Sequence, residues 1–169
     1  MKNEITGMRL RLIVMNFLQF AVWGAYLTSM GTYLFNIGLG ARIGLFYAMQ
    51  GIVSLFMPAV MGIIADRWVP AQKLYGFCHF MAAVFMVAAG WYGYVDGEAV
   101  NFGTLFTFYS LSVAFYMPTL ALTNSVAYTA LDKVKLDPVI AFPPIRIFGT
   151  IGFICSMLLT DILGFQNNY

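Results

Sequence analysis

Long stretches of the chain contain no Lys, Arg, Asp or Glu, and short segments that hold the charged residues separate them. An α-helix needs roughly 20 mainly apolar residues to cross the ~30 Å hydrocarbon core of a bilayer. Each stretch is long enough for one such helix, and only the last is interrupted, by Arg146. The pattern therefore predicts five membrane-spanning helices, near residues 12–35, 43–65, 74–95, 102–131 and 142–163.

The spans are predicted as helices because the hydrocarbon interior offers no water to backbone amides, and a helix satisfies them within its own segment. A membrane β-barrel would instead show segments of about ten residues with alternating apolar and polar positions. The sequence thus predicts an all-α integral membrane domain over residues 1–169, with no soluble domain.

The composition excludes an ordinary soluble domain. Of the 169 residues, 61% are hydrophobic and 9% are charged, whereas soluble chains have roughly 45–50% apolar and about 25% charged residues. The formal net charge is only +2, and the charged residues are scattered along the chain. No nucleic-acid partner is therefore expected. The lipid bilayer is the first partner that the sequence predicts.

The basic residues are distributed unequally between the two ends of the predicted spans. Such residues concentrate in the cytoplasmic loops of membrane proteins. When the loops are assigned alternately to two sides, only Arg42 falls on the second side. We therefore predict a cytoplasmic N-terminus and an external loop with Asp96 and Glu98. The basic residues on the cytoplasmic side are Lys2, Arg9, Arg11, Arg67, Lys73, Lys133 and Lys135.

Three spans carry polar and aromatic residues at steps of three and four, which places each set on one helix face. One interpretation is that the hydroxyl and amide groups join helices while Trp and Tyr lie at the membrane surface. The other is that the three faces line a shared aqueous cavity for a flat, neutral, polar ligand. The sets are Asn16, Gln19, Trp23 and Tyr26; Ser112, Tyr116, Thr119 and Thr123; and Arg146, Thr150 and Phe153.

Arg146 and His79 are ionisable groups within the predicted spans. A charge inside a span is costly and therefore marks a candidate functional residue. Arg146 follows Pro143 and Pro144, which suit the first turn of a helix, so it could also extend to the headgroups. His79 could relay protons or donate a hydrogen bond to a neighbouring helix.

The sequence contains none of several common catalytic motifs. It has no paired-histidine metal motif, no P-loop, no Gly-x-Ser-x-Gly elbow and no pair of carboxylates within the spans, so neither an enzyme nor a metal site is expected. Cys78 and Cys155 lie within spans and are predicted to be small packing residues. We expect no cofactor.

Four segments together resemble the nucleoside:proton symporters of the major facilitator superfamily, over about residues 9–164. The run from Phe142 combines a double proline, an arginine, Gly-Thr and a second glycine in fixed order, and is the most specific part. Gly62, Asp66 and Arg67 resemble part of the superfamily signature between helices two and three, although the following residues depart from it. The segments are FLQFAVWGAYLTSMGTYLF from Phe17, MPAVMGIIADRW from Met57, YMPTLALTNSVAY from Tyr116 and FPPIRIFGTIGF from Phe142.

The resemblance implies roles for particular residues. Substrate contacts are implied at Arg146, Thr150 and Phe153, where polar groups would bind ribose hydroxyls or base edges and a ring would stack on the base. Asp66 with Arg67 is implied to gate the conformational change, although Asp66 could also be a solvated loop carboxylate. The polar faces add three further candidate substrate contacts, Gln19, Trp23 and Tyr116.

The resemblance also implies a larger architecture. Superfamily members have twelve helices in two six-helix halves, with the substrate between the halves. Five spans make an incomplete N-terminal half, so the missing C-terminal half is an expected partner. All acidic residues lie at span ends or in loops, which leaves His79 as the internal candidate for a proton relay. The coupling group is therefore expected in the missing half.

The functional hypothesis is nucleoside transport by proton symport with alternating access, in a bacterial inner membrane, with the proton gradient as the energy source. This chain would be the N-terminal portion of the carrier. One alternative is a carrier of a sugar or another polar solute. A second is a membrane scaffold that does not transport, and a reading frame continuing into further spans would argue against it.

Overall fold

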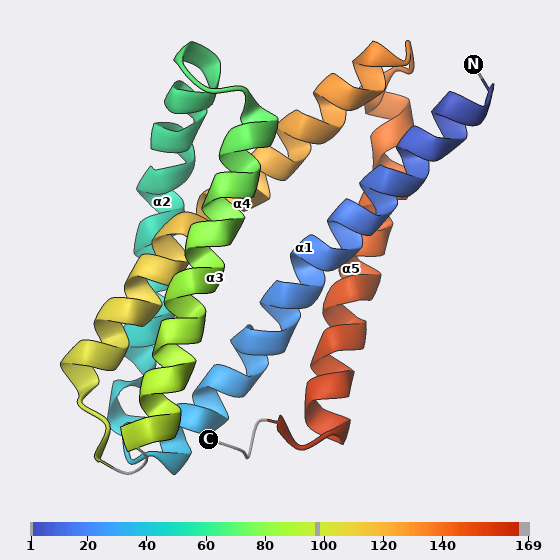
Figure 1. Cartoon of the computed structure of the whole chain (residues 1–169). Coiled ribbons are helices and arrows are strands. Elements are labelled where there is room, and N and C mark those ends of the chain that lie inside the picture. The colour runs from blue at the N-terminus through green and yellow to red at the C-terminus, as the bar shows by residue number, and fades with distance from the viewer. Residues whose placement is uncertain (1, 97–98, 166–169) are drawn as a thin grey trace. The chain divides into compact units, whose positions relative to one another are not determined.

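The structure is a computed structural model that describes residues 2–96 and 99–165, so the predicted external carboxylate Glu98 lies outside the described residues. Figure 1 shows that the chain is built from long helices. Within these described residues, five helices are long and apolar enough to cross a membrane, so the predicted all-α fold with five spans is confirmed. They are α1 (Lys2–Asn36), α2 (Ile43–Arg67), α3 (Ala71–Asp96), α4 (Phe102–Lys133) and α5 (Pro138–Ile162), with the short 3-10 helix η1 (Gly40–Arg42) before α2.

Two helix starts differ from the sequence prediction. The first helix, α1, begins at Lys2 rather than near residue 12, and α5 also begins earlier than predicted. Asp137 caps the helix, because its side chain accepts a hydrogen bond of 2.9 Å from the backbone N–H of Val139. Pro138 then occupies the first helical position, where a missing N–H costs nothing. The helix thus begins about one turn before the predicted Phe142, and Pro143 and Pro144 lie inside it rather than in its first turn.

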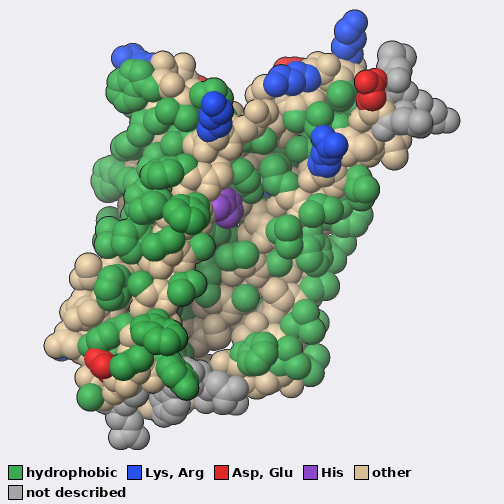
Figure 2. Space-filling model, viewed as in Figure 1, with side chains coloured by type: hydrophobic (Ala, Val, Ile, Leu, Met, Phe, Trp, Pro, Cys, Tyr) green, Lys and Arg blue, Asp and Glu red, His purple; other side chains and the backbone are tan. Residues whose placement is uncertain are grey.

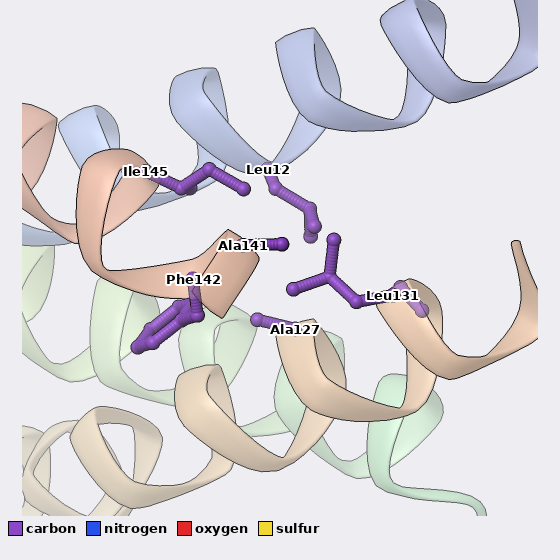
Figure 3. Close-up of a cluster of buried hydrophobic side chains, with 7 residues drawn as sticks. Leu12, Ala127, Leu131, Ala141, Phe142 and Ile145 are labelled. Carbon is purple, nitrogen blue, oxygen red and sulfur yellow. The ribbon is translucent and has the colours of Figure 1, made fainter. Parts of the chain in front are cut away.

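The described residues divide into two units, which we describe separately. The first unit contains α1 up to Met30, α4 from Thr123 onward, and α5; the second unit is Gly31–Leu122. A buried apolar cluster holds the first unit together where α1 and α5 begin and α4 ends (Figure 3). The cluster consists of Leu12, Ala127, Ala130, Leu131, Ala141, Phe142 and Ile145.

Glycines let α1 and α5 approach closely within the first unit. A Cβ on Gly152 would collide with the carbonyl oxygen of Phe17, and one on Gly24 would lie 2.5 Å from the carbonyl oxygen of Phe153. Since residue numbers rise together along both helices, the two helices run parallel. Contact between backbones at small residues is a common basis of helix association in membranes.

The second unit packs α2 and α3 against the first part of α4. Met61, Leu74, Cys78 and Leu122 form its buried cluster. Ser112 donates a hydrogen bond of 2.7 Å to the carbonyl oxygen of Ala82 on α3. Such bonds between helices favour association where no water competes for the donor.

Large apolar side chains cover much of the surface, and Figure 2 shows them along the face in view. Phe56, Phe80, Val87 and Ile147 are among the exposed members. An apolar surface of this extent is unsuited to water but suits contact with lipid chains. Together with the five spans, it identifies an integral membrane protein.

Candidate functional site

The predicted site residues of α1 and α5 lie within the first unit, along the seam between these helices. Because α5 begins at Pro138, Arg146 lies about two turns inside the helix. Its guanidinium carbon is 3.9 Å from the centre of the Phe20 ring on α1. A cation over an aromatic face is stabilised by the negative potential of the ring. No described carboxylate forms an ion pair with Arg146.

Gly149 makes room for this contact. A Cβ at this position would lie 2.7 Å from Cδ2 of Phe20 and 2.8 Å from Nη1 of Arg146. The glycine one turn after the arginine therefore lets the ring and the guanidinium lie against α5 together. Any larger residue would displace one of them.

Trp23 and Phe153 continue the seam. The Trp23 ring packs edge-on against Phe153 with centroids 6.0 Å apart, and its centroid is 6.1 Å from that of Phe20. The indole Nε1 is buried and has no hydrogen-bond partner among the described residues. A buried donor without an acceptor is costly unless a ligand or water supplies one.

Gln19 and Thr150 have different surroundings. Gln19 is 2% exposed on α1 and has interactions of its own. Thr150 is exposed on α5, one turn after Arg146. Arg146 and Trp23 thus both lie against Phe20, and Phe153 lies against Trp23. Thr150 is exposed.

Tyr116 and His79 lie in the second unit. The two rings meet edge-on with centroids 6.0 Å apart, and Tyr116 is buried. His79 Nδ1 lies 3.0 Å from the carbonyl oxygen of Tyr75, one turn earlier on α3. This contact occupies one ring nitrogen with the backbone of its own helix. The proton-relay role of His79 stays a prediction.

Asp66 and Arg67 are exposed at the end of α2. Neither side chain forms an ion pair with any residue that the structure describes. The end of the helix is closed instead by the backbone N–H of Trp68, which bonds the carbonyl oxygen of Ile64 at 3.0 Å. Their gating role therefore stays a prediction.

Sequence reasoning missed two groups that the structure places at helix contacts. Phe20 lies three residues before Trp23, so helical spacing could have placed it beside the candidate face. Gln50 on α2 is buried and hydrogen-bonds through Nε2 to the hydroxyl of Tyr109 on α4, within the second unit. A glutamine within a span is itself a signal of such a contact. No cluster of three metal-binding side chains occurs among the described residues.

Comparison with protein families yields a match over residues 6–167, to the family described as "Nucleoside H+ symporter". The xanthosine permease of Escherichia coli K12 is 42% identical over 156 residues, which cover 91% of this chain and 36% of the permease. The nucleoside permease NupG of the same strain is 39% identical over 163 residues, which cover 95% of this chain and 37% of NupG.

The fold matches a solved crystal structure. The nucleoside transporter NupG, in its D323A mutant form, superposes with a TM-score of 0.86 at 38% identity, covering 94% of this chain and 38% of NupG. The arrangement of helices is thus that of part of a major facilitator superfamily transporter. This chain spans a little over a third of the length of the relatives that it matches. These relatives are permeases, which transport solutes and are not enzymes.

Proposed function

We propose that this chain, which belongs to the nucleoside H+ symporter family, is part of a carrier that moves nucleosides across a membrane together with protons. The observation that carries the proposal is the contact of Arg146 with Phe20 beside Trp23 and Phe153. A nucleoside offers a flat base and a ribose with several hydroxyls. Between α1 and α5, aromatic rings are available to the base, and a guanidinium and an indole N–H are available to the ribose hydroxyls.

Each side chain has a proposed role in binding. Arg146 donates hydrogen bonds to ribose hydroxyls or to base carbonyl oxygens, and its fork of donors fixes their direction. Phe153 and Trp23 stack against the base, while the unpaired Nε1 of Trp23 donates to a substrate acceptor. Gln19 and Thr150 are proposed further contacts, and the role of Tyr116, in the second unit, stays a prediction. Phe20 holds the guanidinium in place without needing to touch substrate.

The proton gradient is the proposed energy source, and no organic cofactor is required. The remainder of a twelve-helix carrier would supply the second wall of the site and the group that couples proton and substrate movement. His79 is a lesser candidate for proton transfer, because its Nδ1 already contacts the backbone. Asp66 and Arg67 are proposed to act in the conformational change.

Orientation and location are proposed as well. We infer a cytoplasmic N-terminus from the distribution of basic residues. Several lie at the start of α1 and at the end of α4, whereas Arg42 is the one basic residue at the start of α2. The membrane is proposed to be the inner membrane of a bacterium. A reporter that is active only in the cytoplasm, fused before Lys2, should be active; activity only of a periplasmic reporter would reverse the orientation.

The proposal is tested by uptake of labelled nucleosides into cells that express the complete reading frame containing these residues. Labelled uridine and adenosine should accumulate with a proton gradient and stop accumulating when an ionophore removes it. An excess of unlabelled nucleoside should compete, whereas a hexose should not. Uptake of a sugar but of no nucleoside would favour the alternative cargo, and no uptake of any solute would favour a scaffold.

A further inference from the structure

A cavity with basic walls lies at the end of the first unit where α1 begins and α4 ends. Its volume is about 640 Å³. Three basic residues line it: Arg11 on α1, Lys133 at the end of α4 and Lys135 just after that helix. The lining also includes one carboxylate, that of Glu4. Figure 2 shows blue basic side chains and a red carboxylate at the end of the molecule where α1 begins. The cavity therefore presents three cations and one anion.

The backbone at Lys135 is unusual for a lysine. The residue has a φ of +57°, in the left-handed region where L side chains are disfavoured. Lys135 ends α4 with two backbone hydrogen bonds. The N–H of Lys135 donates to the carbonyl oxygen of Asp132, and the N–H of Leu136 donates to the carbonyl oxygen of Leu131. Glycine is the usual residue at this position of a helix terminus. A lysine here costs backbone free energy but adds an ammonium group to the cavity wall.

The cavity also meets an apolar surface. Ile5, Met8 and Val134 contribute apolar atoms to its lining. Steps of three and four from Arg11 lead along one face of α1 to Val14, Leu18 and Val22, which are 48%, 56% and 50% exposed. This stripe runs from the charged end of the span toward its middle. Its direction matches a lipid, whose headgroup lies at the membrane surface and whose chains point inward.

We propose that this cavity binds the phosphodiester headgroup of an anionic membrane phospholipid, with an acyl chain along the apolar stripe of α1. Phosphate oxygens accept hydrogen bonds from the guanidinium of Arg11 and the ammonium groups of Lys133 and Lys135. Basic pockets between helices at the membrane surface suit anionic headgroups. A lipid accounts for both the charge and the apolar stripe, whereas free phosphate accounts only for the charge. The lipid site is independent of the proposed nucleoside site.

The test measures lipid binding to the purified chain in a neutral detergent by native mass spectrometry. Phosphatidylglycerol is the anionic probe, and phosphatidylcholine and inorganic phosphate are the comparisons. We expect phosphatidylglycerol to bind more tightly than phosphatidylcholine. The variants Arg11→Gln and Lys133→Gln should each weaken its binding about fivefold, the effect of losing one basic group near an anionic headgroup.

The variant Lys135→Gly separates binding from folding. Glycine relieves the left-handed backbone, so the unfolding temperature should stay the same or rise while lipid binding falls. Arg9→Gln is the matched control, because it removes the same charge from α1 but lines a different cavity beside Asp137. It should leave binding unchanged.

Several results would overturn the lipid site. Equal binding of the two lipids would remove the role of headgroup charge. An equal loss in Arg9→Gln would show that overall charge, not this cavity, attracts the lipid. Displacement of phosphatidylglycerol by millimolar inorganic phosphate would assign the cavity to a free anion.

Discussion

At the scale of single residues, the central question is how a guanidinium is stabilised inside a membrane-spanning helix. Arg146 lies about two turns into α5. Its guanidinium carbon is 3.9 Å from the centre of the Phe20 ring. A desolvated cation–π contact contributes about 2 kcal/mol, and an exposed one about 0.5–1 kcal/mol. Gly149 allows this geometry because it leaves the ring and the guanidinium in contact with α5. The charge is therefore held in a defined direction.

Replacing Phe20 tests whether the ring positions Arg146. Phe20→Leu should raise the KM for nucleoside uptake between about twofold and thirtyfold, the equivalent of about 0.5–2 kcal/mol. Phe20→Tyr, which keeps the aromatic face, should restore most of the affinity. The matched control is Phe35→Leu, an exposed residue of the same helix. A normal KM in Phe20→Leu would show that Arg146 is positioned without the ring.

The indole of Trp23 supplies a second test at this scale. Trp23→Phe keeps an aromatic ring beside Phe153 but removes the buried N–H that lacks a partner among the described residues. If this group donates to substrate, KM should rise about two- to tenfold, the usual worth of a hydrogen bond. Trp91→Phe, at an exposed position on α3, is the control. An unchanged KM in Trp23→Phe would remove the indole N–H from the site.

At the scale of elements, the close approach of α1 and α5 depends on glycine. At Gly152 even a methyl group would collide with the backbone of Phe17, so the helices must separate or shift. Overpacking of this kind typically costs about 1–3 kcal/mol. The same separation would also move Phe20 and Trp23 away from α5.

Gly152→Ala should therefore lower the unfolding temperature of the chain in detergent and weaken nucleoside uptake. The control is Gly90→Ala on α3, where an added Cβ meets nothing within 4 Å. There alanine should be neutral or stabilising by about 0.5–1 kcal/mol, because it favours the helix more than glycine does. If both variants unfolded at the same temperature as the unmodified chain, the glycine contact would not be needed for packing.

Most of the element scale could be predicted from sequence, since uncharged runs of sufficient length admit few structures in a bilayer. The exceptions are two helix starts. The first helix begins at Lys2 rather than near residue 12, because its first turns carry charged residues that a count of apolar residues leaves out. The start of α5 is formed by Asp137 and Pro138, a standard helix start that hydrophobicity does not detect. Contacts between helices were harder to predict from the sequence. Spacing placed Arg146 and Phe153 on one face but could not show that Phe20 lies over the guanidinium. Likewise, nothing in the sequence marks the backbone oxygen of Ala82 as the acceptor for Ser112.

At the scale of the whole molecule, the apolar surface and five long helices explain why the chain resides in a membrane. The few polar residues within the spans are then the candidates for function. The chain covers a little more than a third of the length of related permeases. A substrate site between the two halves of such a fold needs walls from both halves. The seam between α1 and α5 is proposed as one of these walls.

The most direct test of this account is proton-driven uptake of labelled uridine by Arg146→Ala, expressed from the complete reading frame that contains these residues. Arg9→Ala serves as the matched control, and the amount of each protein in the membrane is measured. We predict that Arg146→Ala reaches the membrane at normal levels but loses uptake, while Arg9→Ala transports normally. Undiminished uptake by Arg146→Ala would contradict the proposed site.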